Sequence, residues 1–178
     1  DTINGGVGRD YLHGGKGNDV LQGDSGRDKI YGGGGKDTVL GGTWHDTILG
    51  EAGSDWLSGE DGQDVVFGGR GRDTIFGGSW DDKVSGGKGS DNIDGGSGRD
   101  KLFGGKGGDH LLGGGGGDTI KGGGGNDFIN GQDDADRIFD GAGLDTIFGG
   151  EGADHFIFAS DGQKDLLADF EVGLDLLD

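Results

Sequence analysis

The sequence predicts an all-β fold: a parallel β-roll, which is a right-handed β-solenoid with two nine-residue units in each coil. Three observations predict it. An aspartate recurs at every ninth position, an apolar side chain follows each aspartate by two residues, and glycines precede the aspartate at fixed spacings. A short, strictly kept period is typical of architectures in which each unit stacks on its neighbours.

The aspartate register is unbroken from Asp1 to Asp154. Composition alone, with 50 glycines, would also fit a disordered, glycine-rich linker. A linker has no physical reason to keep aspartate and aliphatic positions in register across 154 residues. The register therefore favours a folded repeat.

Each unit is expected to form a turn followed by a short strand. Glycines stand five, four and two residues before the aspartate, as Gly5, Gly6 and Gly8 do before Asp10, and this density of glycine would break a helix. In a strand the apolar residue points inward while its two neighbours point outward. Two units with their two turns then make one flattened coil of about 18 residues. The inward row comprises Ile3, Leu12, Leu21, Ile30, Val39, Ile48, Leu57, Val66, Ile75, Val84, Ile93, Leu102, Leu111, Ile120, Ile129, Ile138, Ile147 and Phe156.

The charge balance favours cations as partners. The chain has 34 acidic and 15 basic residues and a formal net charge of -19, which disfavours nucleic acid and anionic membrane surfaces. Only 29% of the residues are hydrophobic, so burial of one aliphatic side chain per unit does not offset the entropy lost by ordering a glycine-rich backbone. No cysteine is present, so the additional stability must come from a metal ion or a partner. No apolar stretch approaches the length of a membrane span.

The unit resembles the nonapeptide G-G-x-G-x-D-x-U-x of the repeats-in-toxin (RTX) family, the hemolysin-type calcium-binding repeat, from residue 1 to about residue 157. The resemblance implies several bound Ca²⁺ ions, passage through a type I exporter of a bacterium, and an extracellular or cell-surface location. The residues themselves argue for calcium-coupled folding. Ca²⁺ prefers six to eight oxygen ligands, and stacked turns offer one carboxylate each together with backbone carbonyls.

The aspartates of the register from Asp10 onward are the candidate Ca²⁺ ligands. Because successive turns alternate between the two sides of the coil, these aspartates divide between two edges, with roughly eight ions per edge at most. The first edge carries Asp10, Asp28, Asp46, Asp64, Asp82, Asp100, Asp118, Asp136 and Asp154. The second edge carries Asp19, Asp37, Asp55, Asp73, Asp91, Asp109, Asp127 and Asp145.

Most departures from the glycine pattern lie on the first edge. A residue other than glycine takes the third glycine position before Asp46, Asp82 and Asp136, and a bulky residue at a backbone angle that suits glycine is strained. Missing or distorted sites are therefore expected there. On the second edge only Glu51 and Asp140 deviate, which predicts a more continuous row of ions. The first-edge departures include Trp44, Trp80 and Asp134 at the third glycine, and Asp24 and Glu60 at the second.

Outward-facing apolar residues show an additional period of 36 residues. One interpretation is the duplication of a block of four units. The other is an apolar stripe for dimerisation or for docking a neighbouring domain. The residues are Tyr31, Leu40, Phe67, Phe76, Phe103, Leu112, Phe139 and Phe148.

The register fails after Phe156, which divides the chain into a roll over residues 1–157 and a C-terminal cap over residues 158–178. The tail resembles the pattern D-x-I-x-D-F-x-x-G-x-D-x-I-D that closes RTX rolls. Leu166, Leu167, Leu176 and Leu177 are expected in its apolar positions. An open end of a solenoid must be covered, since its unpaired strand edge otherwise aggregates.

The sequence contains no H-E-x-x-H, G-x-S-x-G or G-K-S/T motif, so the module itself is expected to be non-catalytic. The main hypothesis is a module that folds on binding Ca²⁺ after secretion and stabilises its parent extracellular protein. An alternative is the C-terminal part of a secreted enzyme, such as a metalloprotease, a lipase, a polysaccharide epimerase or an adenylate cyclase toxin. A third is an adhesin or ice-binding roll, which the lack of a regular outward Thr and Asn array disfavours. In each case the chain is expected to be a piece of a larger protein with an upstream catalytic or adhesive domain.

Overall fold

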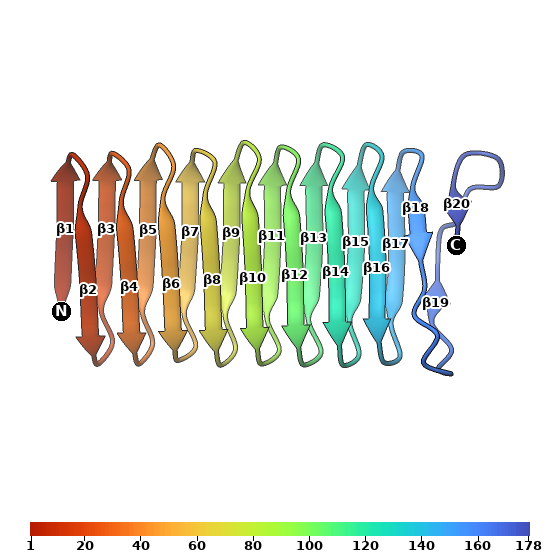
Figure 1. The fold of residues 1–178 in the computed structure, drawn as a ribbon, viewed down its shortest axis with the longest axis horizontal. Helices are drawn as coiled ribbons and strands as arrows, with labels where there is room; N and C mark the ends of the chain where they lie inside the picture. Colours follow the sequence, from red (N-terminus) through yellow and green to blue (C-terminus); the bar gives the residue numbers. More distant parts are fainter.

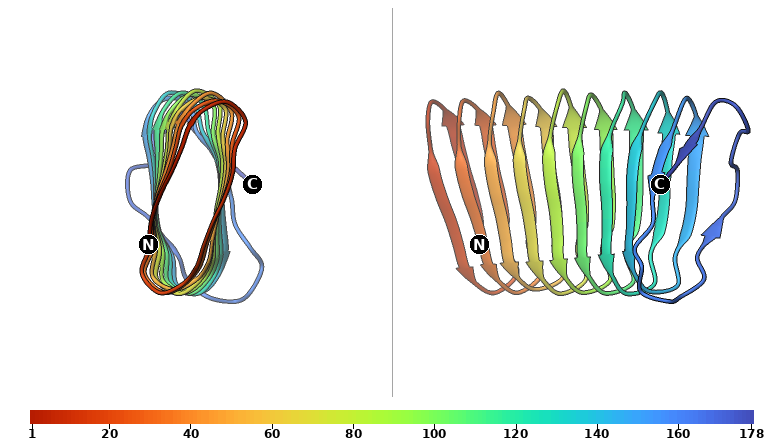
Figure 2. Two further views of the ribbon diagram at one scale, coloured as in Figure 1. Left: turned by 90° about the vertical axis from the view of Figure 1, so that its left-hand side faces the viewer. Right: turned by 45° about the vertical axis from the view of Figure 1, so that its right-hand side comes forward.

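The computed structural model describes residues 1–178 and consists of β-strands joined by turns and loops. Successive strands alternate between two parallel sheets that face each other across a flattened coil (Figures 1 and 2). One sheet contains β1 (Thr2–Val7), β3 (Val20–Ser25), β5 (Thr38–Thr43), β7 (Trp56–Asp61), β9 (Thr74–Ser79), β11 (Asn92–Ser97), β13 (His110–Gly115), β15 (Phe128–Asp133), β17 (Thr146–Glu151) and β19 (Leu166–Leu167). The other contains β2 (Tyr11–Lys16), β4 (Lys29–Gly34), β6 (Thr47–Ala52), β8 (Val65–Arg70), β10 (Lys83–Lys88), β12 (Lys101–Lys106), β14 (Thr119–Gly124), β16 (Arg137–Ala142), β18 (His155–Ile157) and β20 (Leu176–Leu177). No helix long and apolar enough to cross a membrane is present.

The strand register confirms two nonapeptides per coil. Ile3 of β1 lies beside Leu21 of β3, and Leu12 of β2 lies beside Ile30 of β4, so paired residues are 18 positions apart. The same offset runs through the stack as far as β18. The predicted parallel β-roll is therefore the observed fold.

The core is a narrow double row between the two sheets. Its 17 buried apolar residues are those of the predicted inward row from Leu12 to Phe156, with Ile3 at the open first coil only partly buried. In each full strand the second residue and the residue two positions later face inward, as Leu102 and Gly104 do in β12; this later residue is glycine in every full strand except β16, where it is Asp140. The interior is therefore one aliphatic side chain deep, and little apolar surface is available to hold the coils together.

The outward apolar residues form two rows on opposite faces of the roll, and the single stripe considered from the sequence is not present. Residues nine positions apart lie in different sheets, so Phe67 belongs to β8 and Phe76 to β9. Both side chains are a little over one third exposed, at 37% and 36%. Each face therefore carries one half of the outward apolar residues, at a spacing of two coils.

The C-terminal segment continues both sheets with very short strands. In β19 Leu166 lies beside Thr146, and in β20 Leu176 lies beside His155, so the offset lengthens from 18 residues to 20 and 21. Loops before and after β19 leave the outline of the coil, as the end-on view in Figure 2 shows. Of the four predicted apolar cap residues, Leu167 alone packs against the core. Leu166, Leu176 and Leu177 are more than half exposed. Leu166 and Leu176 lie beside the outward residues Thr146 and His155, whereas Leu177 lies beside the core residue Phe156 at the end of the stack.

Candidate metal sites

The 17 candidate aspartates lie where the sequence places them, in two rows along the two edges of the roll. Each one ends a turn directly before a strand, as Asp28 does before β4 and Asp37 before β5. All are at most 3% exposed except Asp10, which is half-buried in the first coil. Aspartate is rarely buried to this degree unless it is paired or bound to a metal.

Hydrogen bonds between coils hold each row together. From Asp10 to Asp136, the backbone N–H of each aspartate in the rows donates to Oδ1 of the aspartate 18 residues later, for example from Asp28 to Asp46 at 2.7 Å and from Asp37 to Asp55 at 2.9 Å. The carboxylates are consequently stacked at the spacing of the coils, with one oxygen of each fixed. The second oxygen has no such role.

Oδ2 of every one of these aspartates is buried and has no hydrogen-bond partner. A buried carboxylate oxygen without a partner costs free energy, and natural proteins seldom leave such an atom unsatisfied. Here the same atom is unsatisfied in each of the 17 turns. A regular feature of this kind is typical of carboxylates that serve as cation ligands.

In every turn of the rows except that of Asp145, the first glycine opens a small space beside this oxygen. A methyl group at Gly50 would lie 2.7 Å from Oδ2 of Asp55 and 2.7 Å from the carbonyl oxygen of Gly68 in the next coil. At Gly5 the distances to Oδ2 of Asp10 and to the carbonyl oxygen of Gly23 are both 2.9 Å. The space thus has a carboxylate oxygen and a carbonyl oxygen at its walls. These are the ligand types that Ca²⁺ prefers, and the residues present fit a hard divalent cation.

Without a bound cation, the electrostatics of the two rows would favour proton uptake. Burial raises the pKa of Asp64 to about 7 and the pKa values of Asp82 and Asp136 to about 8, although the N–H bond from the preceding aspartate opposes the shift. Neighbouring carboxylates raise these pKa values further, since the negative charges repel each other. Near neutral pH, a cation and protons therefore compete for the same oxygens.

The turns with a bulky third residue are less disturbed than the sequence suggests. Trp44 and Trp80 have φ angles of 84° and 79°, in the left-handed region that glycine would occupy without strain. The N–H of Trp44 still donates to the carbonyl of Asp61 at 2.8 Å, so the hydrogen bonds to the next coil impose the usual turn. Oδ1 keeps its hydrogen bond at 2.7 Å in all three cases: Asp46, Asp82 and Asp136. The expected distortion of the ion sites themselves stays a prediction. A smaller number of ions on this edge stays a prediction.

Sequence analysis missed two aspartates that extend the rows into the tail. The N–H of Asp145 donates to Oδ1 of Asp165 at 3.0 Å, and the N–H of Asp154 donates to Oδ1 of Asp175 at 3.1 Å. The signal was present, because each aspartate is followed after one residue by leucine, as in the repeat. Two and three additional residues in the connecting loops concealed the register.

The substitution of Asp140 for a first turn glycine has a larger effect than expected. Its side chain enters the interior, where it is 2% exposed and where its Oδ2, like those of the turn aspartates, has no partner. The sequence showed a deviation at this turn without showing that it adds a carboxylate to the second row.

Comparison with known proteins agrees with this geometry. The model of the RTX calcium-binding nonapeptide repeat, in four copies, matches residues 1–21, 13–43, 45–75, 69–102, 76–111, 103–136, 112–143 and 130–161. A search of curated proteins gives no match. The matched segments together span nearly all of the roll, so the chain belongs to the family of RTX calcium-binding nonapeptide repeats.

Proposed function

We propose that this chain is a non-catalytic, calcium-responsive folding module in which Ca²⁺ ions between adjacent turns hold the coils together. The observation that carries the proposal is the pair of rows of buried aspartates whose Oδ2 atoms lack a partner. The proposed ligands are the turn aspartates of both edges from Asp10 to Asp154, with the carbonyl oxygen of the first turn glycine in the next coil.

The repulsion within each row explains why the ions matter. Carboxylates in adjacent coils are separated by about one strand spacing, roughly 4.8 Å. At an effective dielectric constant of about 20, two such charges repel by about 3 to 4 kcal/mol. Without a cation the row must take up protons or separate. Because the core is only one side chain deep, we expect separation and an expanded chain at neutral pH.

Family membership supports a location outside the cell, where calcium-dependent folding would be useful. Extracellular calcium modules bind with dissociation constants of about 0.1 to 1 mM, well above the free calcium of a cytosol. The chain would then be unfolded inside the bacterium, pass through a narrow type I exporter, and fold outside. There it would stabilise the extracellular protein of which it is a part.

The tail supports a division into a roll over residues 1–157 and a cap over residues 158–178. Both carboxylate oxygens of Asp169 accept hydrogen bonds from the last full coil, from the N–H groups of Gly149 at 2.9 Å and Gly150 at 3.0 Å. Together with Asp165 and Asp175, this residue satisfies donors that a further coil would otherwise bind. We propose that this segment closes the end of the roll through its carboxylates more than through apolar burial.

A calcium titration followed by far-UV circular dichroism tests the proposal. The chelated chain should show little β-structure, and Ca²⁺ should restore it cooperatively. Asp73→Asn removes one fully buried turn carboxylate and should shift the midpoint to higher calcium, whereas Asp94→Asn, on the outer face of β11, should leave it unchanged. Full β-structure in chelator, or equal midpoints for the two variants, would overturn the proposal.

A further inference from the structure

The turn of Asp145 differs in kind from the other turns of the roll. In every other turn the first glycine position holds glycine, but here it holds Asp140, the fourth residue of β16. That position faces the space in which Oδ2 of the turn aspartate and a carbonyl oxygen of the next coil meet. A carboxylate at this position therefore adds an oxygen ligand where an ordinary turn has only a hydrogen atom.

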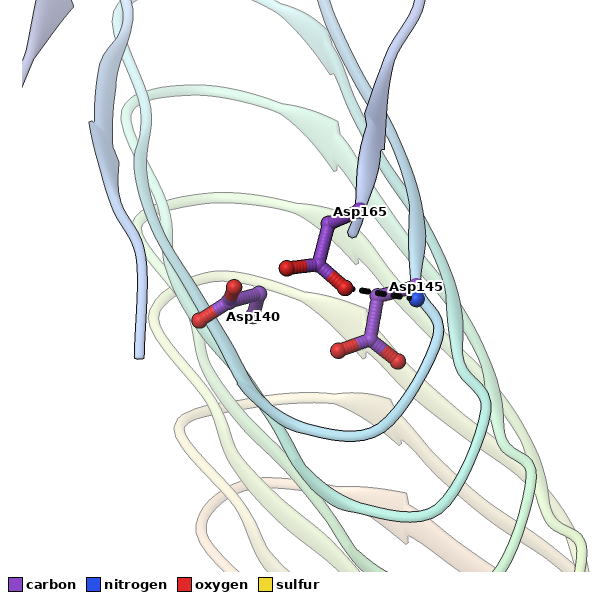
Figure 3. A group of neighbouring side chains, drawn as sticks. All are labelled: Asp140, Asp145 and Asp165. Carbon is purple, nitrogen blue, oxygen red and sulfur yellow. Dashed lines mark hydrogen bonds between the residues drawn. The ribbon is translucent and has the colours of Figure 1, made fainter. Parts of the chain in front are cut away.

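The tail brings a third carboxylate to the same place. One oxygen from each of Asp140, Asp145 and Asp165 lies within 4.8 Å of the other two. Two oxygens bound to one Ca²⁺ ion at about 2.4 Å can be no more than about 4.8 Å apart, so one ion could contact all three. Figure 3 shows the three carboxyl groups gathered inside the last turns, with Asp165 arriving from the segment that follows the roll.

The hydrogen bonds leave free those oxygens that an ion would need. Oδ1 of Asp140 accepts the N–H of Ala159 at 2.8 Å, and Oδ1 of Asp145 accepts the N–H of Asp127 at 2.7 Å. Oδ2 of Asp140 and Oδ2 of Asp145 are both buried and unpartnered, and each residue is 2% exposed. The two ion pairs of the structure involve other residues, so no basic side chain neutralises this group.

We propose that Asp140, Asp145 and Asp165 form a three-carboxylate Ca²⁺ site that binds more tightly than the ordinary turns and ties the last coil to the C-terminal segment. The comparison with ordinary turns rests on the proposed function. Affinity for Ca²⁺ rises with the number of charged ligands, and this group has one carboxylate more than two stacked turn aspartates provide. Because Asp140 also holds Ala159, occupation of the site should order the chain between β18 and β19.

The test is equilibrium dialysis of the full chain against radioactive calcium at buffered free concentrations. For the wild-type chain we expect one ion to bind at a free calcium concentration about tenfold or more below that for the remaining ions. Asp140→Gly restores the usual glycine, so it should fold in millimolar calcium and lose this ion alone. Asp24→Gly is the matched control, since it also restores a repeat glycine but lies in a first-edge turn far from Asp140 in the sequence. This variant should retain the tight ion.

Asp165→Asn provides a second removal at a residue that follows the roll; its remaining side-chain oxygen can still accept the N–H of Asp145, and the variant should also lose the tight ion. Identical binding curves for the wild-type chain and Asp140→Gly would overturn this inference alone, as would retention of the tight ion in Asp165→Asn. Absence of calcium binding in the wild-type chain would overturn the proposed function as well, so the two failures are distinguishable.

Discussion

Replacement of Gly50 by alanine should disturb one calcium site and little else. The added methyl group would lie 2.7 Å from both Oδ2 of Asp55 and the carbonyl oxygen of Gly68, whereas ordinary contacts begin near 3.4 Å. The φ angle of Gly50 lies outside the left-handed region, so backbone strain does not contribute. The neighbours must move by several tenths of an ångström, and overpacking of this kind costs about 1 to 3 kcal/mol.

Loss of one ion adds to this cost. A site held at a calcium concentration about 100 times its dissociation constant contributes about 2.7 kcal/mol to stability. For Gly50→Ala we therefore expect a free energy of unfolding lower by about 4 to 6 kcal/mol, measured by urea denaturation in saturating calcium. Gly124→Ala is the control on the same edge, because a methyl group there meets nothing within 4 Å, and it should stabilise the chain by about 0.4 to 1 kcal/mol. Equal stability and equal bound calcium in the two variants would refute the claim that the space beside Gly50 belongs to a calcium site.

Three further predictions follow from the core, the strained turns and the buried carboxyl groups. Ile75 is fully buried, so Ile75→Ala should lower the free energy of unfolding by about 2 to 5 kcal/mol in urea denaturation. A loss below about 1 kcal/mol would contradict a core made of the two inward rows. Trp44 is 65% exposed and has a φ of 84°, so Trp44→Gly should relieve backbone strain and raise the urea midpoint by the equivalent of about 1 kcal/mol. A lower midpoint would show that packing of the indole ring outweighs the strain. In the calcium-free chain, the folded-state pKa values of Asp82 and Asp136 are raised to about 8, so the folded state binds more protons than the unfolded state. This contribution to stability is complete below the unfolded pKa of about 4 and is lost as pH rises through about 8. Circular dichroism of calcium-depleted protein should therefore show more β-structure near pH 5 than near pH 8. More β-structure near pH 8 would contradict the predicted direction of the pH dependence.

The repeat predicts the fold in detail because every unit has the same inward strand position and the same turn. Once Ile3 is assigned to an inward strand position, the register places Leu21 beside it, and Asp10 and Asp28 fall on one edge. Each local preference agrees with the same coil, and such agreement is what makes a sequence specify a structure. The position of the candidate ligands therefore required no tertiary information.

The features that sequence analysis missed are those where a neighbouring coil determines the outcome. Trp44 adopts the glycine conformation because backbone hydrogen bonds to the next coil impose it, and a single turn cannot reveal that constraint. Asp165 and Asp175 continue the rows although loops of altered length precede them, so a search at a period of nine passes over both. The buried position of Asp140 likewise depends on where the tail passes.

The most direct test of calcium-coupled folding is the radius of gyration of the chain, measured by small-angle X-ray scattering with and without calcium at neutral pH. A folded chain of this length should have a radius of gyration of about 16 Å, and an unfolded one about 45 Å. We expect a value near the larger figure in chelator and a return to about 16 Å when millimolar Ca²⁺ is added. A compact particle of unchanged size after complete removal of calcium would contradict the account.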